Sequence, residues 1–157
     1  MLTLGLVTAA SIGVLRFSSV AEARSSDRVA KQQGPDGKAV YGTTCAACHQ
    51  ATGDGVSGIF PPLAGSEWVT GDEAKLARII LHGITGPIEV AGETYTGMMP
   101  PWGGVLKDPE LAAVLTYIRS SWGNKATPVT AAKVASIRAA TTARATPWTA
   151  AELTAIK

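Results

Sequence analysis

Cysteine and histidine are scarce in this chain, which has only two of each among its 157 residues. Cys45, Cys48 and His49 stand within five positions, and His82 is the other histidine. A structural zinc site takes four nitrogen or sulfur ligands, so one could form only if His82 joined the other three. The chain also lacks a Ser/His/Asp set, a phosphate-binding loop and a suitably spaced carboxylate pair. The sequence therefore provides no recognisable catalytic apparatus.

Charge is also sparse, at 17% of the residues against 46% hydrophobic residues, which suits one compact domain. No segment resembles a nucleic-acid-binding module, so we expect no nucleic-acid partner. Residues 24–123 carry 8 Lys and Arg against 10 Asp and Glu, whereas residues 124–157 carry 5 against 1. We expect the basic tail to fold back on the acidic body, and a basic docking face is the alternative.

The most informative feature present is the pentapeptide Cys45-Ala46-Ala47-Cys48-His49. Two thiols three residues apart on one helical turn can each form a thioether with a haem vinyl group, and the adjoining imidazole then reaches the iron. A redox-active dithiol would not need the histidine, and no βαβ pattern surrounds these cysteines. The spacing predicts one covalently attached haem c, held by Cys45 and Cys48, with His49 as a metal ligand.

Residues 1–23 have the pattern of an export signal. The segment from Leu2 to Leu15 is apolar, and Ala21-Glu22-Ala23 has the small-x-small form that signal peptidase cleaves. No Lys or Arg precedes Arg16, and an uncleaved anchor that associates with the membrane is the alternative, although the apolar run is shorter than the ~20 residues that span a bilayer. We expect cleavage and a periplasmic location, with residues 24–36 as a flexible lead-in.

Several segments have helical patterns. Residues 37–49 form the first predicted helix, with the cysteines at its end. The capping box Thr70-Gly71-Asp72-Glu73 predicts a middle helix that ends at Gly83. Asp108 is expected to cap the clearest helix, which Gly123 stops. In the tail, threonine caps at Thr130 and Thr149 predict two short helices.

Two segments lack such a period. The prolines of Phe60-Pro61-Pro62-Leu63-Ala64-Gly65 exclude a helix or a central strand there. Residues 83–104 contain six glycines and three prolines, which predicts an irregular loop that wraps around something.

In this order, the C-x-x-C-H motif, the P-x-L-x-G segment, a methionine loop and a closing amphipathic helix resemble class I cytochrome c over residues 34–123. The methionine loop Gly97-Met98-Met99-Pro100-Pro101-Trp102 and the following helix are similar to the monohaem bacterial domains found beside dehydrogenases, nitrite reductases and terminal oxidases. Class II cytochromes carry their haem motif near the C-terminus, so the early position of the motif in this chain argues against that class. The resemblance implies an all-α fold with helices wrapped around one haem over residues 37–123, and a helical C-terminal extension over residues 124–157.

The resemblance also implies a ligand set. Beyond the signal, His82, Met98 and Met99 are the remaining candidates for the sixth ligand of the iron. The resemblance selects Met99, which precedes a proline, and makes His49 the proximal ligand. His82 is better explained as the last residue of a helix, a position that needs no haem.

Surrounding residues can be assigned only by the same resemblance. Pro61 matches the position whose carbonyl accepts a hydrogen bond from the proximal imidazole, and Leu63 would pack on the haem face. Trp68, Tyr95 and Trp102 are candidate donors to the haem propionates.

The implied function is electron transfer by a haem that cycles between Fe(III) and Fe(II), without enzymatic activity of its own. Expected partners are redox proteins: a dehydrogenase, a reductase or a terminal oxidase. Two alternatives remain. One is a haem protein with an open or labile sixth position that acts as a gas sensor or weak peroxidase, and the other is a dedicated cytochrome subunit of a dehydrogenase or oxidase complex.

Overall fold

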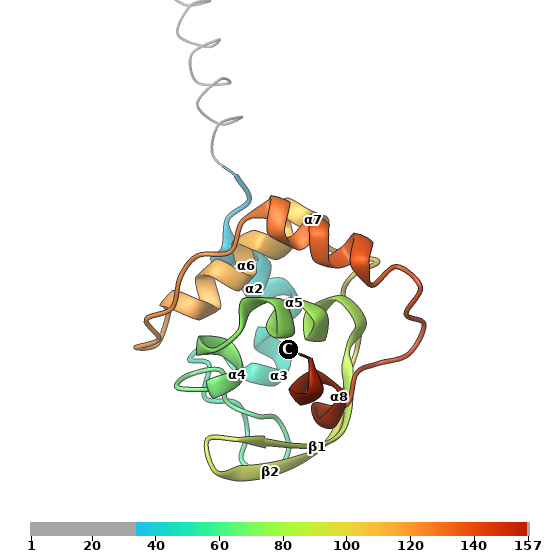
Figure 1. Ribbon diagram of the computed structural model, residues 1–157. Coiled ribbons are helices and arrows are strands. Elements are labelled where there is room, and N and C mark those ends of the chain that lie inside the picture. The colour runs from blue at the N-terminus through green and yellow to red at the C-terminus, as the bar shows by residue number, and fades with distance from the viewer. Residues whose placement is uncertain (1–33, 157) are drawn as a thin grey trace, which may run out of the picture. The chain divides into compact units, whose positions relative to one another are not determined.

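The computed structural model describes residues 34–156, shown in colour in Figure 1. The predicted export signal and most of the lead-in lie outside these residues. Within the described part of the chain, no helix is both long enough and apolar enough to cross a membrane.

The first predicted helix is present as two segments, α2 (Gly37–Thr44) and α3 (Ala46–His49), with a break at Cys45. Asp36 caps α2, because its carboxylate accepts a hydrogen bond from the Lys38 N–H at 2.9 Å. Helix α2 crosses α6 (Asp108–Ser120) at Gly37, where even one added carbon would overlap the backbone carbonyl of Ala113. The close crossing fixes the haem-attachment segment against α6, the longest helix within residues 34–156.

The middle helix begins at a different residue from the predicted cap. Thr70 belongs to a separate short helix, α4 (Glu67–Thr70), which the sequence analysis does not predict. Asp72 caps α5 (Glu73–His82) by accepting from the Ala74 N–H at 2.7 Å. Gly83 ends α5 as expected, with a φ of 78° that favours glycine.

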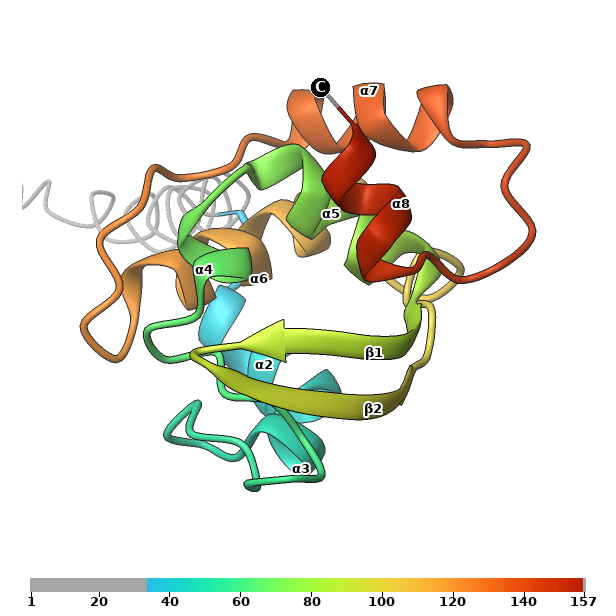
Figure 2. The same ribbon diagram turned by 60° about the horizontal axis from the view of Figure 1, so that its bottom comes forward.

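The prediction of an irregular loop over residues 83–104 is wrong. Strands β1 (Ile84–Val90) and β2 (Glu93–Met99) form an antiparallel hairpin, visible in Figure 2 as the only sheet of the described residues. The two turn residues, Ala91 and Gly92, both have positive φ, as the tightest hairpin turns require. Gly86 and Gly97, which interrupt the sequence pattern of the two strands, are paired directly opposite each other in the hairpin. The fold is mostly helical, as expected, with this small sheet added.

The last three helices lie close to their predicted positions. Asp108 does not cap α6 but lies in its first turn, and the N-terminus is closed by the Lys107 N–H, which donates to the Glu110 carboxylate at 2.9 Å. In the tail, α7 (Ala131–Ala140) and α8 (Ala150–Ala155) have the predicted caps Thr130 and Thr149.

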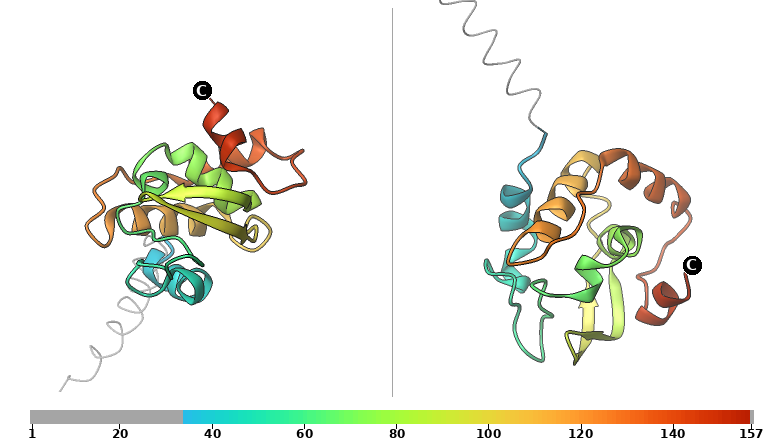
Figure 3. Two further views of the ribbon diagram at one scale, coloured as in Figure 1. Left: turned by 90° about the horizontal axis from the view of Figure 1, so that it is seen from below. Right: turned by 60° about the vertical axis from the view of Figure 1, so that its left-hand side comes forward.

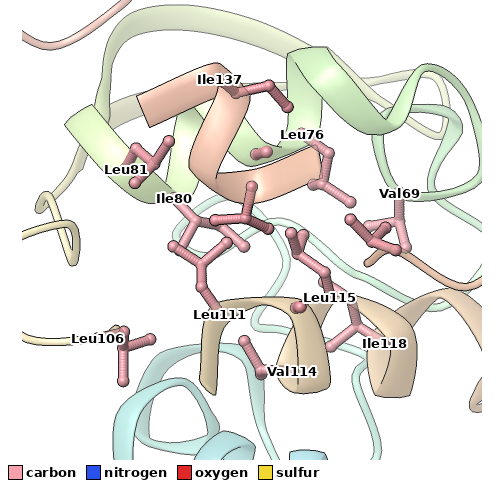
Figure 4. Packing of buried hydrophobic residues seen from close by; sticks show 14 of the residues in the cluster. Val69, Leu76, Ile80, Leu81, Leu106, Leu111, Val114, Leu115, Ile118 and Ile137 are labelled. Atoms are coloured by element: carbon pink, nitrogen blue, oxygen red, sulfur yellow. The ribbon is translucent and has the colours of Figure 1, made fainter. Parts of the chain in front are cut away.

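The C-terminal tail packs on the body of the domain. Figure 3 shows α7 alongside α5 and α6, with α8 next to the hairpin. In the core, drawn in Figure 4, Ile137 of α7 meets Leu76 and Ile80 of α5 above Leu111 and Leu115 of α6. The expected pairing of a basic tail with an acidic body is confirmed by two ion pairs, Arg138–Asp108 at 2.7 Å and Lys133–Glu73 at 3.6 Å.

Candidate haem-binding site

A cavity of about 330 Å³ lies between the haem-attachment segment, the proline loop, the hairpin and helices α5 and α6. Its lining is predominantly apolar, and it includes the following aliphatic and aromatic residues: Ile59, Phe60, Leu63, Val69, Leu76, Ile79, Ile80, Ile84, Ile88, Val90, Val114 and Ile118. An apolar cavity with a few placed polar groups is the usual form of a cofactor site.

Both cysteine side chains line this cavity, and neither forms a disulfide. Cys45 is half-buried and Cys48 is exposed. Burial raises the pKa of the Cys45 thiol, and the hydroxyl of Thr44, 3.2 Å from Cys45 Sγ, opposes this effect. The two thiols are therefore available together at one wall of the cavity, as attachment to a single group requires.

His49 is buried at the end of α3 and lines the same cavity. Its Nδ1 lies 2.9 Å from the carbonyl oxygen of Pro61, and because a carbonyl can only accept, Nδ1 carries the proton. Burial lowers the pKa of His49, although this hydrogen bond opposes the shift, so the imidazole is held neutral. Nε2 is then the unprotonated nitrogen, which is the form that binds a metal.

The loop that presents the Pro61 carbonyl is held from two sides. On one side, the Leu63 and Ala64 N–H groups donate to the Gly53 carbonyl at 2.7 and 3.0 Å. On the other, the buried Asn124 accepts from the Gly65 N–H and donates to the Leu63 carbonyl, each at 2.9 Å. Leu63 itself packs against the core and also lines the cavity, and its contact with the haem face stays a prediction.

Asn124 is a positioning residue that the sequence analysis does not assign. Its amide also donates to the Ile118 carbonyl near the end of α6 at 2.8 Å, so one side chain joins this helix to the proline loop. The only signal in the sequence is its place directly after the predicted helix stop at Gly123, and it lies 59 positions after Gly65 in the chain.

The two neighbouring methionines differ in burial. Met99, the last residue of β2, is half-buried against both hydrophobic clusters of the domain, whereas Met98 is 68% exposed. Both line the cavity, but successive residues of a strand point to opposite faces. Met99 is therefore the thioether with a fixed environment beside the cavity.

His82 is engaged elsewhere and is not among the residues that line the cavity. Its Nε2 lies 2.7 Å from Thr141 Oγ1, and its ring stands edge-on to Trp148. The four ligands that a zinc site would need are consequently not brought together.

The three candidate propionate donors are also separated by the structure. Trp68 and Tyr95 line the cavity, but Trp68 Nε1 donates to the Glu89 carbonyl and the Tyr95 hydroxyl to Glu93, both at 2.8 Å. Trp102 is outside the cavity lining.

Two free thiols, a neutral imidazole and a thioether around one apolar cavity fit a covalently attached haem, and within residues 34–156 they are surrounded by a mostly helical fold. Fold and site together define a c-type haem protein.

Comparisons with known proteins identify the family. The cytochrome c family model matches residues 35–122. The chain is 44% identical over 93 residues to cytochrome c-552 of Thermus thermophilus. The matched residues cover 57% of this chain and 70% of that protein. It is 41% identical over 96 residues to the cytochrome c subunit of the alcohol dehydrogenase (quinone) of Gluconobacter oxydans, covering 60% of this chain and 20% of the subunit.

A further relative is the cbb3-type cytochrome c oxidase subunit FixP of Bradyrhizobium diazoefficiens, 37% identical over 89 residues, which are 55% of this chain and 30% of that subunit. The chain thus spans less than a third of either enzyme subunit. It belongs to the cytochrome c family, whose members typically carry electrons, and Cys45 and Cys48 bind its haem c covalently.

Proposed function

We propose that this protein is an exported electron carrier whose single haem c has His49 and Met99 as axial ligands. The observation that carries the proposal is that both side chains line the apolar cavity into which the two attachment thiols open. The Pro61 carbonyl orients the imidazole, and the end of β2 holds the methionine.

When bound, the haem supplies one-electron exchange between Fe(III) and Fe(II). His49 contributes a neutral nitrogen of fixed orientation, and Met99 contributes a soft thioether, which gives a higher reduction potential than a second histidine would. The aliphatic walls exclude water, so little of the surroundings reorganises on electron transfer. Phe60, which is 37% exposed, and Met98 line the cavity and also reach solvent. A haem held in this cavity would therefore be accessible to a partner from that side.

We further propose a dehydrogenase, a reductase or a terminal oxidase as the redox partner. The relatives include a cytochrome subunit of a dehydrogenase and one of an oxidase, which supports this class of partner. Affinity capture of the mature protein from its native periplasm, followed by a redox titration of the captured proteins, tests it. Recovery of a single stoichiometric enzyme complex would favour a dedicated subunit over a free carrier.

The ligation is tested by absorption spectroscopy of the oxidised protein. Methionine-ligated ferric haem has a weak band at the red end of the spectrum, and we expect this band in the native protein, its loss in Met99→Ala and its retention in Met98→Ala. A high-spin ferric spectrum of the native protein, with rapid binding of carbon monoxide after reduction, would instead indicate the gas sensor or weak peroxidase.

A further inference from the structure

The C-terminal tail pairs with the strand that faces Met99. Trp148 forms a parallel bridge with Ile84 at the start of β1: the Thr85 N–H donates to the Trp148 carbonyl at 2.8 Å, and the Trp148 N–H donates to the Gly83 carbonyl at 3.0 Å. Within the hairpin, Ile84 is the residue directly opposite Met99. Three segments of the chain therefore lie side by side here, and Ile84 in the middle one is paired with Trp148 on one side and Met99 on the other.

The tail also supplies side chains around the methionine. Leu153 of α8 is completely buried and forms a small hydrophobic cluster with Ile79 and Ile84. Met99 and Trp148 both pack against this cluster, which is separate from the larger core beneath α7. The environment of Met99 is thus made partly by residues more than 45 positions further along the chain.

Interactions within the tail fix this contact. The Arg144 guanidinium lies 3.4 Å from the centre of the Trp148 ring, and its Nη2 donates to the Pro147 carbonyl at 2.8 Å and to the Glu152 carboxylate at 2.9 Å. Glu152 in turn accepts from the Thr149 N–H at 2.8 Å, which closes the first turn of α8. These contacts within segment 144–153 therefore hold it in a defined conformation.

We propose that segment 144–153 positions the axial methionine, and that it determines how readily Met99 leaves the iron. Met99 ends a two-stranded hairpin, and such a hairpin has little stability of its own. A third segment that pairs beside Ile84, with Leu153 packed beneath it, restrains the end of the hairpin that carries the ligand. This inference rests on the proposed His49/Met99 ligation.

The test compares two truncations in the tail. Met99 packs against both clusters, but only the small one contains a buried side chain of segment 144–153. Leu153→Ala therefore removes volume that this segment contributes, whereas Ile137→Ala removes volume that α7 contributes to the larger core. Imidazole binds the oxidised protein only when Met99 has left the iron, so its apparent affinity reports the fraction of dissociated methionine. We expect an increase of about fivefold or more in Leu153→Ala, and less than about twofold in Ile137→Ala, at comparable losses of thermal stability.

Equal changes of imidazole affinity in the two variants, or no change in Leu153→Ala, would overturn the inference. If Leu153→Ala does not fold, Arg144→Gln provides the second variant, because it removes the cation over Trp148 from a half-exposed site. Arg144→Gln should raise imidazole affinity and also speed amide hydrogen exchange at Thr85, whose N–H pairs with the tail. The ligation itself is tested separately, by the absorption band of the native protein and of Met99→Ala.

Discussion

His49 and Pro61 are joined by a hydrogen bond of 2.9 Å from the ring Nδ1 to the backbone carbonyl. The eleven residues between them, 50–60, include glycines with positive φ at 53, 55 and 58, which fold the loop back on α3. This one contact fixes the tautomer of the imidazole and leaves Nε2 unprotonated, which is the form that can bind a metal. The position of the loop is therefore as important for the site as the histidine.

Asn124→Ala should lower the free energy of unfolding of the haem-loaded protein by about 2 kcal/mol, because the buried Ile118 carbonyl and the half-buried Leu63 carbonyl would lose the Asn124 amide as a donor. Denaturant titration measures the loss. Lys125→Ala is the matched control, since Lys125 is exposed, and it should stay within about 0.5 kcal/mol of the native protein. A negligible effect of Asn124→Ala would show that the loop does not depend on this side chain.

Gly37→Ala should be strongly destabilising, by about 3 kcal/mol, because the added methyl group would overlap the Ala113 carbonyl and Tyr117 Cβ and force α2 away from α6. Gly42→Ala, in the same helix with no atom within 4 Å of the added carbon, should instead be stabilising by about 0.5 to 1 kcal/mol. Thermal unfolding of the two variants should move in opposite directions. A common direction would contradict the helix crossing described above.

Gly83→Ala should disturb Met99. Gly83 has a φ of 78°, and an added carbon would overlap the Met99 carbonyl and lie 3.1 Å from the nitrogen of Pro101. Gly86→Ala is the control, because its φ of 81° also lies in the region that favours glycine, whereas the added carbon would enter open space. We expect the methionine band of the oxidised protein to weaken in Gly83→Ala only; equal weakening in both variants would point to general strain in the hairpin.

His82 should make the protein less stable in mild acid. Burial lowers the pKa of His82, and Arg144 and Arg138 lower it further. The unfolded state then binds the proton more tightly than the folded state, so the contribution of His82 to stability is fully present above its ordinary pKa of 6.5 and is lost as the pH falls from there through the lower folded pKa.

Urea unfolding between pH 7.5 and 5.5 measures this dependence. His82→Gln should have a flatter pH profile than the native protein over this range, because glutamine does not titrate. Carboxylate titrations are common to both proteins and cancel in the difference. Parallel profiles would mean that the pKa of His82 is not lowered by folding.

Much of the fold was predictable because its signals are local. Thr130 and Thr149 cap the two tail helices by bonds to the third residue along, and such contacts depend only on nearby sequence. The hairpin was missed because Gly86, Pro87 and Gly97 interrupt the alternation by which strands are recognised, and pairing between the two strands overrides that weak local preference.

By itself the sequence determined the haem attachment, because Cys45, Cys48 and His49 need only one turn of chain to come together. It did not distinguish Met99 from Met98 without the likeness to a family, since both are methionines in the same short segment. Tertiary packing makes the two methionines different, because Met99 packs against a cluster to which the tail contributes Leu153, whereas Met98 is exposed. It also placed Asn124 beside a loop 59 residues away, a contact whose free energy exists only once the chain has folded and water has been excluded.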